Sequence, residues 1–139
     1  MKGIFHCRNC GAALTGEITV MSSQDLAVAP AHLRDGEPPC PTGTAFKSHE
    51  PLLRSLTANH RVPLEFVPQF WAHPQDFELA IVQTADVRRR AGCCGMSGCD
   101  DPNMLCRACK AEVGTMQSDC WTPLIFVPEP DYTEFRKTD

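Results

Sequence analysis

Two short Cys-x-x-Cys motifs near opposite ends of this 139-residue chain constrain its fold more than any other feature. The first contains Cys7 and Cys10, and the second contains Cys106 and Cys109. Two thiolates at this spacing can bind one ion from a single tight turn, and two such turns supply the four sulfurs that tetrahedral Zn²⁺ prefers. The sequence therefore predicts a structural zinc site, with Zn²⁺ as its cofactor, that joins two distant segments.

The composition favours one domain over residues 1–139 that is stabilised by zinc. The length suits a single hydrophobic core, but only about a fifth of the residues are Leu, Ile, Val or Phe, which is little for a stable domain. Nine cysteines and twelve prolines fit a chain that relies on metal cross-links and on a restricted unfolded state. We expect a loop-rich segment at 22–43 and a flexible acidic tail from about residue 129.

The net charge and the cysteine content indicate the cellular compartment and the type of binding partner. The cysteine count is odd and the first residues show no apolar run typical of a secretion signal, so we expect a reducing, cytoplasmic compartment. A formal net charge of −4 makes nucleic acid an unlikely partner. No stretch approaches the roughly 20 apolar residues of a membrane span. We therefore expect a protein partner and no membrane.

Hydrophobic periodicity predicts a mostly β fold, of the small α+β class, with short antiparallel strands and one minor helix. Alternation with a period of two is typical of half-buried strands, and Leu52, Leu53 and Leu56 fit one face of a short helix ending near Asn59. A turn is expected at 71–76, because Pro74 disfavours a helical conformation at His73. The predicted strands are 17–21, 62–67, 77–82 and 123–128.

A second group of cysteines offers further or alternative metal ligands. Residues 92–103 are rich in small and turn-forming residues, so their backbone can fold closely around an ion. Neighbouring cysteines point in different directions in most conformations, so Cys94 and Cys120 are better candidates than Cys93 and Cys99. In the main rival arrangement, Cys94 and Cys120 join Cys106 and Cys109 in one site. Cys40, between prolines, is most simply a free thiol.

Arginine occupies the second position of both Cys-x-x-Cys motifs, as Arg8 and Arg107. A guanidinium beside a four-thiolate cluster would offset part of its negative charge. A plain exposed arginine explains the residue equally well, and both alternatives stay open.

The paired motifs resemble the zinc ribbon, in which two Cys-x-x-Cys knuckles on separate hairpins close one site. The gap from Cys10 to Cys106 is far longer than the roughly 15 to 20 residues of the compact pattern, so a large insertion must loop out. The stretch from Gly92 through Gly114 to Trp121, with the first knuckle, also resembles zinc-ribbon-like small bacterial proteins of unassigned function. Cys99 lies outside that pattern. This resemblance implies a zinc-ribbon-like bacterial protein and transfers no mechanism.

The function that these features favour is non-catalytic, although the sequence leaves enzymatic activity open. We expect a metal-stabilised scaffold that binds another protein, with Phe70, Trp71, Trp121 and Tyr132 as candidate contacts and with burial expected for both tryptophans. The alternative is a thiol redox or metal-handling protein that uses the Cys-x-x-Cys pairs. Four thiolates also accept iron, so the metal is open between zinc and iron.

Overall fold

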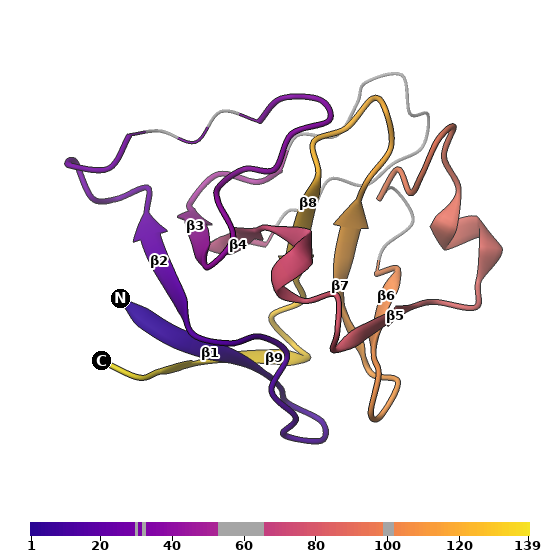
Figure 1. Ribbon diagram of the computed structural model, residues 1–139, viewed down its shortest axis with the longest axis horizontal. Coiled ribbons are helices and arrows are strands. Elements are labelled where there is room, and N and C mark those ends of the chain that lie inside the picture. Colours follow the sequence, from indigo (N-terminus) through magenta and orange to yellow (C-terminus); the bar gives the residue numbers. More distant parts are fainter. Residues whose placement is uncertain (30, 32, 53–65, 99–101) are drawn as a thin grey trace.

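A curled β-sheet is the main regular element of the computed structural model (Figure 1). The structure describes residues 1–29, 31, 33–52, 66–98 and 102–139. Within these ranges the chain forms one nine-stranded sheet and two short 3₁₀ helices, η1 (Pro74–Asp76) and η2 (Val87–Arg90). The strands are β1 (Lys2–Cys7), β2 (Ile18–Ser22), β3 (Thr44–Ser48), β4 (Gln69–Ala72), β5 (Ile81–Gln83), β6 (Met104–Cys106), β7 (Glu112–Gln117), β8 (Ile125–Pro128) and β9 (Thr133–Lys137).

The order of the strands places the two ends of the sheet at β5 and β9. Across the sheet the order is β5-β6-β7-β8-β4-β3-β2-β1-β9, and every pair is antiparallel except β2 with β3, which is parallel. The strands that carry the first cysteine of each knuckle, β1 and β6, therefore each lie second from an edge. The turns after these strands lie near each other at the lower side of Figure 1.

The prediction of a mostly β, small α+β chain is confirmed, and two predicted strands coincide with β2 and β8. The strand predicted at 77–82 is wrong over its first four residues, which form turns; β5 begins only at Ile81. The turn predicted at 71–76 is also shifted, because Trp71 and Ala72 complete β4 before η1 begins. Of the short helix predicted from Leu52 to near Asn59, only Leu52 is described, and it is not helical; the rest of that helix and most of the 62–67 strand lie outside the described residues.

The segment predicted as a flexible tail instead forms β9. Thr133 pairs with Cys7 and Lys137 pairs with Gly3, so β9 lies antiparallel to β1 from Gly3 to Cys7. Between Ser23 and Gly43, where loop is predicted, the described residues form no helix or strand. Among the described residues no helix is long and apolar enough to cross a membrane.

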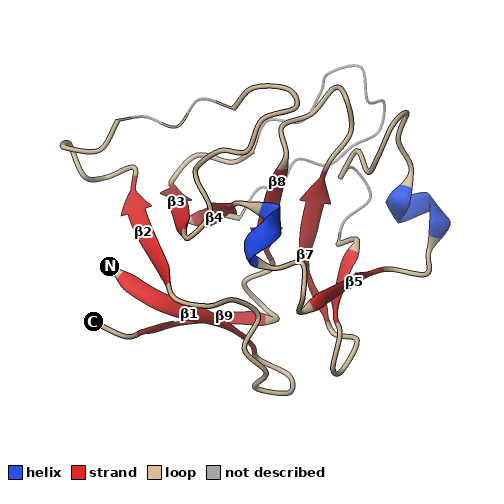
Figure 2. Cartoon of the chain, in the orientation of Figure 1, coloured by secondary structure: helices blue, strands red, loops and turns tan. Residues whose placement is uncertain are grey.

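Phe77 fills the inside of the curled sheet from the short segment that follows η1. Its side chain has no exposed area, and its ring centroid lies 4.4 Å from that of Phe126 on β8 and 5.4 Å from that of Phe5 on β1. Figure 2 shows η1 near the centre of the view, surrounded by strands of the sheet. Cys7 and Cys106 belong to the same buried cluster, so the core extends directly to the knuckles.

Replacing Phe77 with alanine should open a cavity in this core and lower the free energy of unfolding by about 3–5 kcal/mol. Leu79, two residues away and 85% exposed, is the matched control, and Leu79→Ala should change stability by less than about 0.5 kcal/mol. Denaturant unfolding of the metal-loaded proteins measures both values. If both variants lost a similar amount of unfolding free energy, Phe77 would not be a main contact of the core.

Candidate metal centre

Four cysteine sulfurs from the two knuckles converge on one point. The Sγ atoms of Cys7, Cys10, Cys106 and Cys109 all lie within 4.8 Å of one another. Between the knuckles, Cys7 Sγ lies 3.6 Å from Cys109 Sγ, and Cys10 Sγ lies 3.7 Å from Cys106 Sγ. Metal–sulfur bonds of about 2.3 Å in a tetrahedron place the sulfurs about 3.8 Å apart. The four thiols are therefore spaced as a tetrahedral metal ion requires, and this group could hold a metal ion.

The two knuckles have the same backbone geometry. The N–H of Cys7 donates to Ala12 O at 2.9 Å, and the N–H of Gly11 donates to Cys7 O at 2.8 Å. In the second knuckle the N–H groups of Cys106 and Lys110 donate to Ala111 O and Cys106 O, each at 2.8 Å. Each turn thus closes on itself and aims both of its sulfurs to the same side.

A residue with positive φ completes each turn. Gly11 has φ 77° and Lys110 has φ 67°, a left-handed conformation that glycine adopts without steric cost and lysine does not. A Cβ atom on Gly11 would meet no heavy atom within 4 Å. The preference for glycine there comes from the backbone conformation alone.

The motif arginines tie each knuckle to an edge of the sheet by hydrogen bonds. Arg8 Nε donates to Pro130 O at 3.2 Å, just before β9, and Arg107 Nε donates to Leu79 O at 3.0 Å, just before β5. The backbone N–H groups of both arginines also donate to carbonyls of the same segments. The knuckle positions therefore depend on the two edge strands.

The local environment shifts the pKa values of the cysteine thiols in this cluster in different directions. Burial raises the pKa of Cys7 to about 12, and its sulfur accepts hydrogen bonds from backbone N–H groups of the first knuckle. A hydrogen bond from the Asn9 side chain, followed by one from the Ala111 N–H, lowers the pKa of Cys109 to about 6. Such donors stabilise thiolates and so favour the charge state that binds metal. The first knuckle thereby helps to ionise a sulfur of the second.

The structure divides the remaining cysteines between a second cluster and a buried thiol. The sulfurs of Cys93, Cys94 and Cys120 form a separate group within 4.8 Å of one another. Cys94 and Cys120 do not join the second knuckle, so the rival arrangement is not the one observed. Cys93, ranked low from sequence, belongs to the group. Cys99 lies outside the described residues.

Cys40 is 8% exposed, and its thiol donates to Thr44 O at 3.1 Å. Burial raises the pKa of this thiol, which keeps it protonated. The residue belongs to neither of the two sulfur clusters. Its description as a free thiol agrees with this position.

Two residues that shape the clusters were not singled out from the sequence. Asn9 lies between the cysteines of the first knuckle, where any polar side chain could reach a sulfur, while its counterpart Ala108 offers no donor. Asp119 precedes Cys120 and accepts backbone hydrogen bonds from the second cluster. A polar residue adjacent to a candidate ligand was the available signal in both cases.

A scan against protein-family models and searches of curated proteins and of solved structures find no match to this chain. The geometry and chemistry of its own residues therefore carry the interpretation of the site.

The two positive-φ positions should respond in opposite ways to substitution. Gly11→Ala should lower the free energy of unfolding by about 1 kcal/mol, because alanine must adopt the left-handed conformation. Lys110→Gly should not lower it, because relief of the same strain offsets the greater freedom of the unfolded chain. Chemical denaturation of the metal-loaded variants gives both values. A larger loss for Lys110→Gly than for Gly11→Ala would contradict the equivalence of the two turns.

Proposed function

We propose that this protein is a non-catalytic zinc-binding protein whose four-cysteine centre is structural, and that the ordered sheet serves as a scaffold for a protein partner. The observation that carries the proposal is the convergence of four sulfurs from knuckles near the two ends of the sheet. The centre links segments that share no direct strand pairing. A fixed cross-link is what a structural metal supplies.

Zinc is favoured by the donor set and its geometry. Four thiolates in a tetrahedral array, held by tight turns whose N–H groups face the sulfurs, are typical of closed structural zinc sites. Cys7 and Cys106 are 0% and 1% exposed, so half of the ligand set is shielded from solvent. A catalytic zinc site keeps one position for water or substrate, whereas four sulfurs here can fill all four positions. These features support a structural ion.

A thiol redox role receives less support from the geometry. A redox Cys-x-x-Cys pair forms and breaks a disulfide between its own two sulfurs as it exchanges two electrons with a substrate, usually at a helix N-terminus. Here the sulfurs of both motifs form one group, with contacts of 3.6 and 3.7 Å between the motifs, and both knuckles follow strands rather than begin helices. The thiol redox or metal-handling alternative therefore ranks second.

The scaffold part of the proposal rests on exposed aromatic side chains. Trp71 is 7% exposed, which removes it from the candidate contacts, whereas Trp121 is 69% and Tyr132 is 43% exposed. The expected burial of Trp121 is thus not observed. Exposed Trp and Tyr are enriched in the centres of protein interfaces. Proteins that co-purify with the native chain and not with Tyr132→Ser would support this surface, and identical sets would contradict it.

Zinc content and stability of cysteine variants test the structural centre. Wild-type protein should retain tightly bound zinc, and Cys10→Ser or Cys109→Ser should lose that zinc together with several kcal/mol of stability, because apparent zinc binding in such sites reaches about 10–16 kcal/mol. Cys40→Ser is the matched control and should keep its zinc. Elemental analysis and thermal unfolding provide the readouts.

Two outcomes would contradict the proposal. Visible absorption with iron in place of zinc would replace the cofactor, since the same sulfurs can bind iron. Full zinc content and unchanged unfolding in Cys109→Ser would show that the knuckles do not share an ion.

A further inference from the structure

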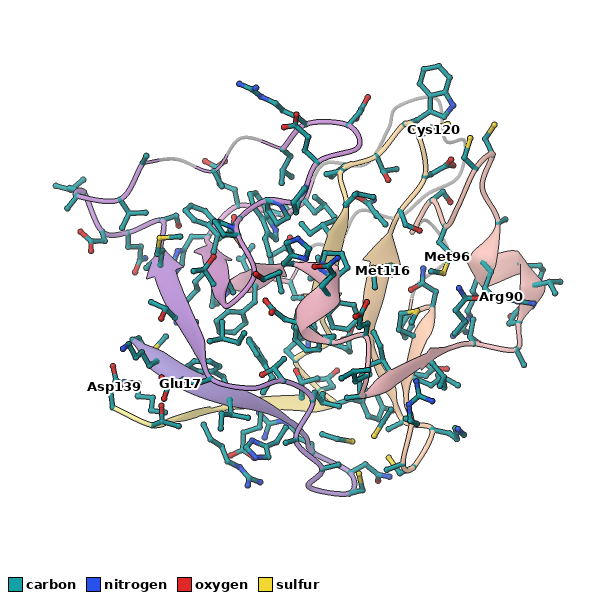
Figure 3. The ribbon with its side chains drawn as sticks, in the orientation of Figure 1. Glu17, Arg90, Met96, Met116, Cys120 and Asp139 are labelled. Atoms are coloured by element: carbon teal, nitrogen blue, oxygen red, sulfur yellow. The ribbon has the colours of Figure 1, made fainter. Side chains whose placement is uncertain are left out.

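The second sulfur cluster lies far from the four-cysteine centre. β7 runs between them, with Cys109 before its first residue and Cys120 after its last. Six strand residues span roughly 20 Å. In Figure 3 Cys120 lies near the top of the view, whereas the knuckles lie at the bottom. The two clusters share no residue.

Three thiols meet in this second cluster from two loops. Cys94 Sγ lies 3.1 Å from Cys120 Sγ, and Cys93 Sγ is within 4.8 Å of both. All three residues are exposed. Their sulfurs are close enough to bind one ion, and solvent can reach that ion.

A buried carboxylate holds the two loops in this arrangement. Asp119 is 5% exposed and accepts the N–H of Cys93 at 2.9 Å, that of Cys94 at 2.9 Å and that of Cys120 at 2.8 Å. One side chain thus fixes the backbone of all three cysteines and adds a negative charge nearby.

The loops also pack too tightly to accept other residues at two positions. A Cβ atom on Gly92 would lie 1.7 Å from Gly95 O, and one on Gly95 would lie 2.5 Å from Ser118 O. The N–H of Met96 donates to Ser118 Oγ, and the N–H of Ser118 donates to Met96 O. This close approach brings adjacent cysteines onto the same side as Cys120.

Charge explains why such a cluster calls for a cation. The three sulfurs lie within 4.8 Å of one another, and the Asp119 carboxylate accepts hydrogen bonds from the backbone of all three cysteines. Three thiolates beside a fixed carboxylate repel one another unless a positive ion lies between them. Soft thiolate ligands select soft metals such as Cu(I) and Zn²⁺.

We propose that Cys93, Cys94 and Cys120 form a second, solvent-accessible site for one thiophilic d¹⁰ metal ion, Zn²⁺ or Cu(I), bound by three thiolates. Binding forms three metal–sulfur bonds and releases the thiol protons to solvent, with no change in oxidation state. A Zn²⁺ ion would keep its fourth position for water or an external ligand, whereas Cu(I) would be complete with three sulfurs. The Asp119 oxygens face the backbone N–H groups, so the carboxylate orients the ligands.

Metal stoichiometry of the full chain tests this site. Reduced wild-type protein that already holds its knuckle metal is titrated separately with Zn²⁺ and with Cu(I) under argon, and bound metal is measured after gel filtration. We expect one further equivalent of at least one metal, which a mild chelator removes while the knuckle ion stays. The double variant Cys94→Ser/Cys120→Ser should lose that equivalent and keep the knuckle metal, and Cys40→Ser should behave as wild type.

The metal that adds the equivalent identifies the occupant. No further equivalent of either metal in wild type, or an undiminished one in the double variant, would overturn the proposal. A Cys94–Cys120 disulfide that persists under the reducing conditions would overturn it as well.

Alkylation in wild type keeps the test valid if the double variant does not fold. Added metal should protect Cys93, Cys94 and Cys120 from N-ethylmaleimide, as read by peptide mass spectrometry, and equal labelling with and without metal would contradict the site. Loss of the knuckle metal in Cys10→Ser bears on the structural centre alone, so the two proposals fail separately.

Discussion

The contact between two pairs of sulfurs closes the gap between the two ends of the sheet. From β6 through β7, β8, β4, β3 and β2 to β1 the strands follow one another in an unbroken hydrogen-bonded order. The knuckles after β1 and β6 bring the ends of that series within 3.6 Å at Cys7 and Cys109. With a metal ion between them, the curled sheet becomes a closed ring of covalent, hydrogen-bonded and coordinate links. Its open edges, β5 and β9, lie just beside the junction and are tied to it by Arg107 and Arg8.

Magnitudes indicate why this junction matters more than any single apolar contact. A small domain is stable by about 5–15 kcal/mol, and a structural four-ligand zinc site supplies a comparable apparent free energy. Burying Phe77 between Phe5 and Phe126 contributes about 3–5 kcal/mol. Apolar packing and coordination act on the same region, because the buried sulfurs of Cys7 and Cys106 belong to that core. The second cluster lies outside it, on two loops fixed by Asp119.

The sequence predicts local features of this chain better than its long-range pairings. The spacing of each Cys-x-x-Cys motif determines a tight turn, so each knuckle follows from local geometry. That the two knuckles meet was inferred from the four sulfurs that a tetrahedral zinc ion prefers. β2 and β8 carry the clear alternation or β-branched content that single sequences reveal. β6 has only three residues, and β9 is polar because it lies at an edge, so neither has a periodic signal. β7 contains Gly114, where a Cβ atom would lie 2.4 Å from the Phe126 ring, a requirement visible only once β8 is in place. Sequence spacing does not predict Cys93 as a ligand, because the tight loop around Gly92 and Gly95, which brings both adjacent cysteines close to Cys120, has no signature in the sequence.

Amide hydrogen exchange, compared between metal-loaded protein and reduced protein stripped of metal, tests most directly whether coordination holds the sheet together. The account predicts that removing the ion exposes the amides of β1 with β9 and of β5 with β6 first and most, and that the loss of protection then spreads inward to β4 and β8. If the amides of β1, β9, β5 and β6 were as well protected in the metal-free protein as in the metal-loaded protein, the result would contradict this prediction. Apolar packing alone would then be sufficient to keep the ends of the sheet together.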